Sequence, residues 1–396
     1  MGLRIETIEI LLLVAAVVAM LARRLRVPYS IGLVMAGIAL AVLPLAPDIE
    51  LTKQLIFTAF LPPLIFEAAF QLKWHELRTD LPVVLSLATV GVLLSAAVTT
   101  LGMHYLAHWS WTSAAVFGVL IAATDPVAVI ATFKDAKVHG RVRLLVEAES
   151  LFNDATAAVA FTIVLVFAAG QSMGIGGAMR SLAIVVIGSL ACGAVVAGIV
   201  LLLAGGTDDH LVEITFTTVG AFGSFLLAEH FHLSGVLATL TTGLMIGNIG
   251  HMSLSAKSRE AVAEFWDYAA FVANSLIFLL IGIRIAHRDY AFVLLPVLVA
   301  IVVVIAGRAL AIYPLSLLFM RSSLRISARH QHILFWGGLR GALALALALG
   351  LPAQMPAREE IITVAFAVVA FSLFVQGLTM TPLMRRLGEL SSETKK

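Results

Sequence analysis

The chain has 396 residues, of which 60% are hydrophobic and 13% charged, with a mean hydropathy of +1.01 and a formal net charge of +2. Soluble proteins carry about 25% charged residues, so the composition excludes a soluble globular protein and indicates a polytopic membrane protein. The single cysteine, Cys192, excludes an internal disulfide and a thiolate metal cluster. The sequence shows no basic footprint of the kind that binds nucleic acid.

Apolar segments follow one another along the whole chain with short connections, and each predicts a membrane-spanning helix. We therefore expect an all-α polytopic membrane protein with about 13 transmembrane helices, forming a single transmembrane domain over residues 1–390 with a short cytoplasmic tail at 387–396. The segments lie near residues 6–22, 29–46, 52–71, 80–106, 111–133, 142–169, 176–204, 209–230, 234–249, 260–285, 290–319, 329–350 and 359–384.

The distribution of basic residues predicts the orientation of these helices. Of the 26 lysines and arginines, 18 fall in loops on one side and 5 on the other if the N-terminus is outside. Cytoplasmic loops carry the excess of positive charge, so we expect the N-terminus outside and the C-terminus in the cytoplasm. Arg23, Arg24 and Arg26 follow the first apolar segment, whereas a cleaved signal peptide carries its positive charge first.

The segment 111–133 contains Thr124-Asp125-Pro126. Pro126 has no N–H to donate, so it leaves the carbonyl of Ala122 unpaired and should interrupt the helix. An interrupted helix inside a membrane is tolerated only where it lines a cavity or is buried in protein. Transporters use such broken helices, with their free carbonyls and half-helix ends, to bind ions at the midplane.

The next segment, 142–169, contains Glu149-Ser150-Leu151-Phe152-Asn153-Asp154. Glu149 and Asn153 are four residues apart, as are Ser150 and Asp154, so each pair lies on one helical face. The two faces together offer hard oxygen donors, which suit a small cation such as Na⁺. A carboxylate at this depth is costly, and intramembrane carboxylates are functional by default.

The second half of the chain repeats this organisation. Splitting thirteen helices as six, one and six places the glycine-rich segment 337–341 in the twelfth helix, at the position matching the fifth. The halves begin on opposite sides of the membrane, which indicates an inverted repeat. The expected boundaries are repeat one at about 6–169, a linking helix at about 176–204 and repeat two at about 209–386.

Six motifs in order give the chain a resemblance to a known family. They are Leu61-Pro62-Pro63-Leu64-Ile65-Phe66-Glu67, Thr124-Asp125-Pro126-Val127, Glu149 to Asp154, Gly307-Arg308-Ala309-Leu310, Gly337-Gly338-Leu339-Arg340-Gly341 and Phe374-Val375-Gln376-Gly377. Together they resemble the monovalent cation/proton antiporters of the NhaP and sodium–proton exchanger type. The resemblance implies an NhaA-like fold with crossing broken helices, the fifth and the twelfth, and a homodimer.

The resemblance also implies roles for the polar residues. Asp154 would carry the ion and the proton, with Glu67 as a second cation ligand, Ser150 as a side-chain ligand and Asn153 as a positioning residue. The expected Na⁺ ligands are Asp154, Glu67, Ser150 and Thr124. The resemblance further implies a structural ion pair between Arg308 and Glu149. A buried arginine needs a carboxylate as its partner.

The polar residues at the helix breaks are expected to support the architecture. Asp125 should stabilise the positive end of a half-helix, and Arg340 should balance the negative half-helix ends. The residues assigned to this crossing are Asp125, Pro126, Gly337, Gly338, Arg340 and Gly341. Arg284 lies near the outer end of the tenth segment, where an interface anchor and a role at the cavity mouth both fit.

We therefore expect a secondary antiporter for pH homeostasis, not an enzyme, that exchanges Na⁺ or Li⁺ for H⁺ one-for-one by competition at Asp154. It would need no cofactor and lie in the bacterial inner membrane. K⁺/H⁺ exchange at the same site is an alternative. A cation channel would need weak binding at many sites, and a membrane hydrolase would need a serine elbow or paired zinc histidines.

Overall fold

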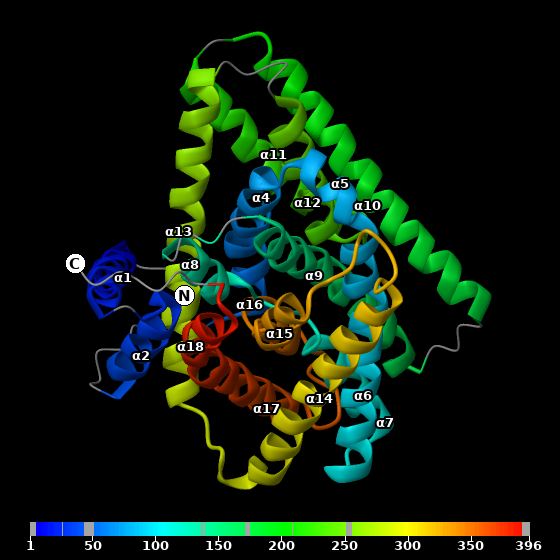
Figure 1. Ribbon diagram of the computed structural model, residues 1–396. Helices are drawn as coiled ribbons and strands as arrows, with labels where there is room; N and C mark the ends of the chain where they lie inside the picture. The colour runs from blue at the N-terminus through cyan, green and yellow to red at the C-terminus, as the bar shows by residue number, and fades with distance from the viewer. Residues whose placement is uncertain are drawn as a thin grey trace. The chain divides into compact units, whose positions relative to one another are not determined.

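The computed structural model describes residues 5–25, 27–42, 51–135, 138, 140–170, 175–207, 209–250 and 256–389. Every regular element among these residues is helical (Figure 1). The expected cytoplasmic tail lies outside the described residues from position 390 onward. The predicted all-helical fold is confirmed.

The helices occupy the predicted apolar segments, and their ends differ from the predicted ends by a few residues. In chain order they are α1 (Ile5–Leu25), α2 (Tyr29–Val42), α3 (Lys53–Leu55), the π-turn η1 (Ile56–Phe60), α4 (Leu61–Gln71), α5 (Trp74–Ser86), the π-turn η2 (Leu87–Gly91), α6 (Val92–Leu106), α7 (Trp111–Leu120), α8 (Val127–Asp135), α9 (Arg141–Ala168), α10 (Ile175–Ala204), α11 (His210–His230), α12 (Gly235–Ile249), α13 (Ala256–Ala286), the 3₁₀ turn η4 (Ala291–Val293), α14 (Leu294–Leu318), α15 (Ala328–Trp336), α16 (Ala342–Leu349), α17 (Arg358–Phe371), the π-turn η5 (Ser372–Gly377) and α18 (Leu378–Leu387).

Eight helical stretches among the described residues are long and apolar enough to cross a membrane. Four shorter apolar helices accompany them, at Ile8–Ala22, Tyr29–Val42, Trp111–Leu120 and Gly235–Ile249. Length and composition thus support a polytopic helical membrane protein, while the number of crossings stays a prediction.

Two compact units make up the chain, and they alternate along the sequence. The first contains Met1–Lys53, Pro82–Asn153 and Ser275–Lys396, and the second contains Gln54–Leu81 and Asp154–Asn274. The helices α3, α5, α9 and α13 contribute residues to both units. This division does not follow the expected repeat boundaries, which stay a prediction.

In the first unit, α6 packs along both α7 and α14, while α17 packs against α7, α14 and α16. Side-chain caps set where several of these helices begin. The Ser110 hydroxyl accepts from the N–H of Ser113 at the start of α7, and Ser327 accepts from His330 at the start of α15. Each cap satisfies a backbone donor that has no partner within its helix.

In the second unit, α10, α11 and α12 lie side by side, and α12 packs along α4 (Figure 1). Phe66 of α4 packs on Trp266 of α13, with ring centroids 4.4 Å apart, at the centre of the apolar core. Pro62 and Pro63 occupy the first turn of α4, directly after the π-turn η1. Proline is tolerated in a first turn because the N–H groups there need no partner within the helix.

Glycines allow α2 and α13 to pack with their backbones in contact in the first unit. A Cβ atom on Gly37 would lie 2.2 Å from the carbonyl oxygen of Leu279, and one on Gly282 would lie 2.2 Å from that of Val34. Small residues at such contacts allow the close van der Waals packing that holds helices together in a membrane.

We predict that Gly282→Ala lowers the free energy of unfolding by about 1–3 kcal/mol, because the added methyl group forces the two helices apart. The matched control is Gly198→Ala in α10, where a Cβ atom would meet nothing within 4 Å. Thermal unfolding of the two purified variants in the same detergent measures the difference. Equal stability of the two variants would contradict this packing.

Candidate functional site

Two helices of the first unit are interrupted in mid-course. The first break, at residues 121–126, separates α7 from α8, and the second, at residues 337–341, separates α15 from α16. The broken segments contact each other, since the N–H of Asp125 donates to the carbonyl of Leu339 at 2.8 Å. The breaks thus fall where Pro126 and the glycine-rich segment predict them.

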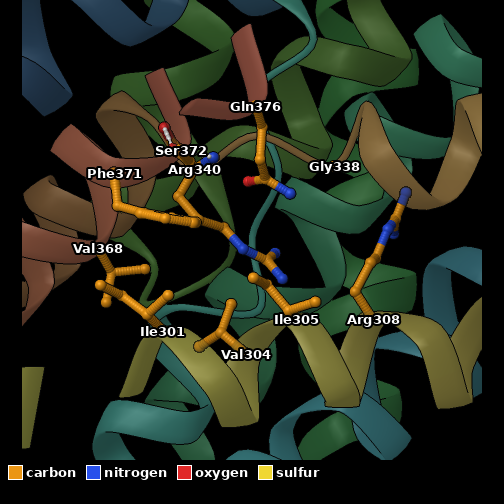
Figure 2. Close-up of a pocket in the computed structure, with 10 residues that line it drawn as sticks. All are labelled: Ile301, Val304, Ile305, Arg308, Gly338, Arg340, Val368, Phe371, Ser372 and Gln376. Carbon is orange, nitrogen blue, oxygen red and sulfur yellow. Dashed lines mark hydrogen bonds between the residues drawn. The ribbon is translucent and has the colours of Figure 1, made fainter. Parts of the chain in front are cut away.

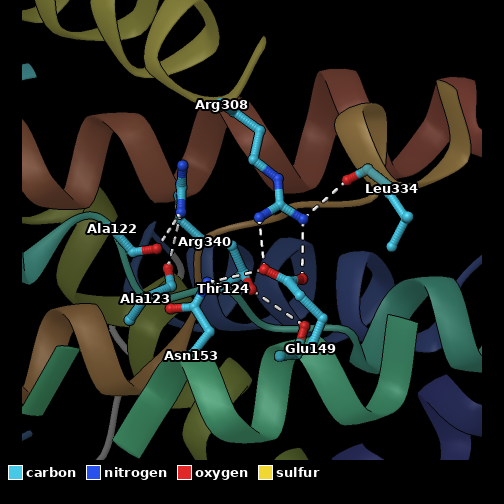
Figure 3. Close-up of polar contacts among 9 residues, drawn as sticks. Ala122, Ala123, Thr124, Glu149, Asn153, Arg308, Leu334 and Arg340 are labelled. Carbon is cyan, nitrogen blue, oxygen red and sulfur yellow. Dashed lines mark hydrogen bonds and ion pairs between the residues drawn. The ribbon is translucent and has the colours of Figure 1, made fainter. Parts of the chain in front are cut away.

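Arg340 satisfies the carbonyls at the end of α7. Its Nη1 donates to the carbonyl oxygens of Ala122 at 2.7 Å and Ala123 at 3.1 Å (Figure 3). The Ala122 carbonyl is the one that Pro126 leaves without an intrahelical donor. Arg340 is 2% exposed, so its charge lies against the negative end of a half-helix.

Asp125 acts at the opposite, positive ends of the half-helices. Its Oδ1 accepts from the N–H of Val127 at 3.0 Å, at the start of α8. The N–H of Ala342, the first residue of α16, also donates to this carboxylate. One carboxylate therefore caps the N-termini of both half-helices, where negative charge is stabilised.

Glycines in the second break leave room for these charged side chains. A Cβ atom on Gly341 would lie 1.9 Å from Oδ2 of Asp125, and one on Gly338 would lie 2.5 Å from Nε of Arg308. Both distances are far below van der Waals contact, so a larger residue would displace the carboxylate or the guanidinium. These close approaches account for the glycines in the sequence.

Glu149 and Arg308 form a buried, bidentate ion pair. Arg308 Nη1 donates to Glu149 Oε1 at 2.7 Å, and Nη2 donates to Oε2 at 2.9 Å. Arg308 Nη2 also donates to the carbonyl of Leu334 at 2.9 Å, on the last turns of α15. Because Glu149 is 1% exposed and Arg308 6% exposed, both charges are removed from bulk water, and each depends on the other.

Asn153, Thr124 and Ser150 extend this network toward the first break. Asn153 Nδ2 donates to Glu149 Oε1 at 3.2 Å and to Thr124 Oγ1 at 3.3 Å. The hydroxyls of Thr124 and Ser150 lie 3.1 Å apart. The structure thus brings together four sequence-predicted site residues, all buried, as neighbours around two hydroxyl oxygens.

Asp154 and Glu67 belong to the second unit. Asp154 is half-buried and follows Asn153 along α9, which is continuous from Arg141 to Ala168. Glu67 is half-buried on α4, where its Oε1 accepts from Nε2 of Gln71 at 2.6 Å. Gln71 Nε2 also donates to Oδ1 of Asp267 at 2.8 Å, so one amide links two carboxylates.

The side chains of Thr124, Ser150 and Glu149 carry oxygen atoms, which are hard ligands. Among the described residues, no group of three or more His, Cys, Asp and Glu side chains is arranged to hold a metal ion. A resident zinc site would need such a group. The neighbouring hydroxyl oxygens of Thr124 and Ser150, 3.1 Å apart, are hard ligands of the kind that small cations prefer.

Sequence reasoning did not assign several polar groups of the structure. Ser372 Oγ accepts from the N–H of Arg340 at 3.0 Å, and Glu213 of α11 is a fully buried carboxylate. A glutamate inside the apolar segment 209–230 was a visible signal for the latter. The link from Gln71 to Glu67 has the same four-residue spacing that identified Glu149 and Asn153.

Comparisons with known proteins identify the family to which the chain belongs. The profile of the sodium/hydrogen exchanger transmembrane family matches residues 10–386. The Na⁺/H⁺ antiporter ApNhaP of Aphanothece halophytica is 36% identical over 94% of this chain and 72% of its own length. The Na⁺/H⁺ antiporter NhaH of Halobacillus dabanensis is 35% identical over 96% of this chain and 98% of its own.

A solved structure shares the fold. The sodium proton antiporter MjNhaP1 from Methanocaldococcus jannaschii, solved at pH 8, has a TM-score of 0.78 at 20% identity and covers 97% of this chain and 96% of its own. At 20% sequence identity, this similarity shows that the two proteins share a fold. Together with the profile match and the two relatives, it shows that the chain belongs to the transmembrane sodium/hydrogen exchanger family, among the antiporters of the NhaP type.

Proposed function

We propose that the chain is a secondary antiporter that exchanges Na⁺ or Li⁺ for H⁺ across the membrane, with K⁺/H⁺ exchange at the same site as the alternative. The contact between the two interrupted helices carries this proposal. Arg340 holds the carbonyls of Ala122 and Ala123, and Asp125 caps both half-helices. Interrupted helices stabilised in this way are how secondary transporters build midplane ion sites.

Exchange would follow from competition between a cation and a proton for Asp154. Glu67, Ser150 and Thr124 would supply the further Na⁺ ligands, and Asn153 would hold the hydroxyl of Thr124 in place, in line with their hydrogen bond. The loaded and the protonated site each carry a compensated charge and can be carried across. The empty, ionised site cannot, because a bare carboxylate is costly to move through a low-dielectric barrier.

We propose the matching architecture of about 13 transmembrane helices in two inverted repeats, with the breaks at 121–126 and 337–341 forming the crossing. The N-terminus would lie outside and the C-terminus in the cytoplasm of a bacterial inner membrane, and two copies would form a homodimer. The family resemblance supports these statements, together with the excess of basic residues in the predicted cytoplasmic loops.

A cation channel is the competing class of function. A channel needs a continuous pore with weak binding at several sites, whereas the hydroxyls and amide in the first unit form one compact, buried cluster. The two classes differ in flux, because an antiporter saturates with cation and couples every cation to a proton. Dye-reported proton movement in everted vesicles, driven by NaCl, LiCl or KCl across pH, separates them and ranks the cations.

We predict that Asp154→Asn abolishes exchange for every cation, while the protein still folds and inserts. A neutral amide can neither release a proton nor balance the charge of a cation. The matched control is Asp289→Asn, which alters a carboxylate in the loop before η4, where Asp289 caps the N–H of Ala291. Exchange retained in vesicles that contain Asp154→Asn would refute the assignment.

We predict that Arg308→Ala lowers the free energy of unfolding by about 3–5 kcal/mol, because it leaves the buried carboxylate of Glu149 unpaired. The double variant Arg308→Met, Glu149→Gln should recover part of that loss, since neither charge is left alone.

The control for this pair is Lys73→Ala, because Lys73 forms an exposed ion pair with Glu76 at 3.4 Å. Its removal should change stability by no more than about 0.5 kcal/mol. Denaturation of all the variants in one detergent gives the comparison. If Arg308→Ala unfolds at the wild-type midpoint, the pair does not stabilise the fold.

We predict one-for-one, electroneutral exchange. Asn153 has no proton to trade, and an arginine such as Arg308 keeps its proton at any working pH. Glu67 and Asp154 would share one proton in the cation-free state, since like charges in one site resist ionising together. Proteoliposomes with an imposed membrane potential and no ion gradient test this stoichiometry.

Voltage alone should move no Na⁺ into these proteoliposomes. Voltage-driven uptake would show that the exchange is not one-for-one. The same assay on Glu67→Gln then identifies the source, because uptake that loses its voltage dependence in this variant assigns the extra proton to Glu67.

A further inference from the structure

A small cavity lies in the first unit between α14, the π-turn η5 and the segment 337–341 (Figure 2). Its polar lining consists of Arg308, Gly338, Arg340, Ser372 and Gln376, and the remaining lining residues are aliphatic or aromatic. The space open to the centre of a water molecule is about 10 Å³, which is close to what a single water needs.

Two buried donors beside this cavity have no hydrogen-bond partner among the residues that the structure describes. They are the Nε–H groups of Arg308 and Arg340. The terminal nitrogens of both arginines already donate hydrogen bonds. Those of Arg308 donate to Glu149 and to the carbonyl of Leu334. Nη1 of Arg340 donates to the carbonyls of Ala122 and Ala123. A buried donor without an acceptor is costly, and buried polar groups in folded proteins almost always have a protein or water partner.

Gln376 presents an acceptor to the same cavity. Figure 2 shows its amide pointing between the backbone of Gly338 and the guanidinium of Arg340. Its side chain is 6% exposed, and the amide forms no hydrogen bond with a side chain or backbone group of the described residues. The π-turn Ser372–Gly377 carries it, and π-turns inside α-helices are often found at functional sites.

We propose that this cavity holds one ordered water molecule, which accepts from Nε of Arg340 and donates to Oε1 of Gln376, and that Gln376 is thereby a positioning residue for cation binding. The volume of the cavity and the polar groups that line it both fit one water molecule rather than a larger ligand. Ser372 already fixes the backbone of Arg340 through its hydroxyl, so Gln376 would fix the side chain of the same residue.

The water and Gln376 would affect cation binding through Arg340. Its Nη1 holds the carbonyls of Ala122 and Ala123, and these residues directly precede Thr124. A guanidinium that loses its water-mediated anchor can turn, which shifts the segment that carries the Thr124 hydroxyl. This inference rests on the proposed function, in which that hydroxyl is a cation ligand.

The test compares Gln376→Met, which keeps the shape but removes both polar atoms, with Gln376→Glu, which keeps an acceptor oxygen. In proteoliposomes, Gln376→Met should raise the apparent KM for Na⁺ by about fivefold or more, with Vmax within about twofold of wild type. Gln376→Glu should restore the KM to within about twofold of wild type.

The matched control is Gln331→Met, which removes a glutamine amide that donates to the carbonyl of Ile326 at 2.9 Å. This variant should leave the KM unchanged. If Gln376→Met does not insert, Gln376→Asn, whose amide is one methylene too short to reach the water, takes its place. An unchanged KM, or equal KM values for the Met and Glu variants, overturns the positioning role.

A high-resolution map of the wild-type protein tests the water independently of transport. A density peak within hydrogen-bond distance of both Arg340 Nε and Gln376 is expected, and it should be absent from Gln376→Met. A dry cavity overturns the proposal. Wild-type protein that moves no protons in response to Na⁺ would instead contradict the proposed function, and the map would still decide whether the water is there.

Discussion

The rest of the first unit depends on how the backbone of two interrupted helices is satisfied without water. A carbonyl that loses its intrahelical donor inside a membrane must find another one. Arg340 supplies that donor to Ala122 and Ala123, and Asp125 accepts from the N–H groups at the starts of α8 and α16. The two charges thus stabilise opposite ends of the half-helices, so the unwound segments form part of the fold.

The need to satisfy buried polar groups without water also governs the ion pair of Glu149 and Arg308. The terminal nitrogens of Arg308 donate to Glu149 and to the carbonyl of Leu334, which lies in α15 just before the second break. Glu149 also accepts from Asn153. The ion pair therefore joins α14 and α9 to the interrupted helix. A buried pair of this kind need not add net stability over an apolar substitute, but it fixes one arrangement of the helices, because any other leaves a bare charge.

Features that depend on neighbouring residues in the chain could be predicted from the sequence. Pro126 located the first break, because a proline removes a hydrogen-bond donor from the helix that contains it. Contacts between distant segments, such as the Ser372 hydroxyl on the backbone of Arg340, follow no sequence period and had no such signal. The π-turns were also missed, since a one-residue shift in hydrogen bonding is decided by packing rather than by composition. The Gln71 link to Glu67 could have been found, because it follows the ordinary four-residue rule for one helical face.

Two carboxylates near the breaks, Asp125 and Glu149, already accept hydrogen bonds from donors in the first unit. Asp125 accepts from two backbone donors, and Glu149 accepts from a guanidinium and an amide. Protonating either one would remove the charge on which a half-helix end or a buried arginine depends, so each is tied to the architecture. A transported cation and proton need a carboxylate whose charge state can change without that loss. In the proposed function Asp125 and Glu149 are therefore architectural, and the proton and the cation are assigned to other carboxylates of the chain.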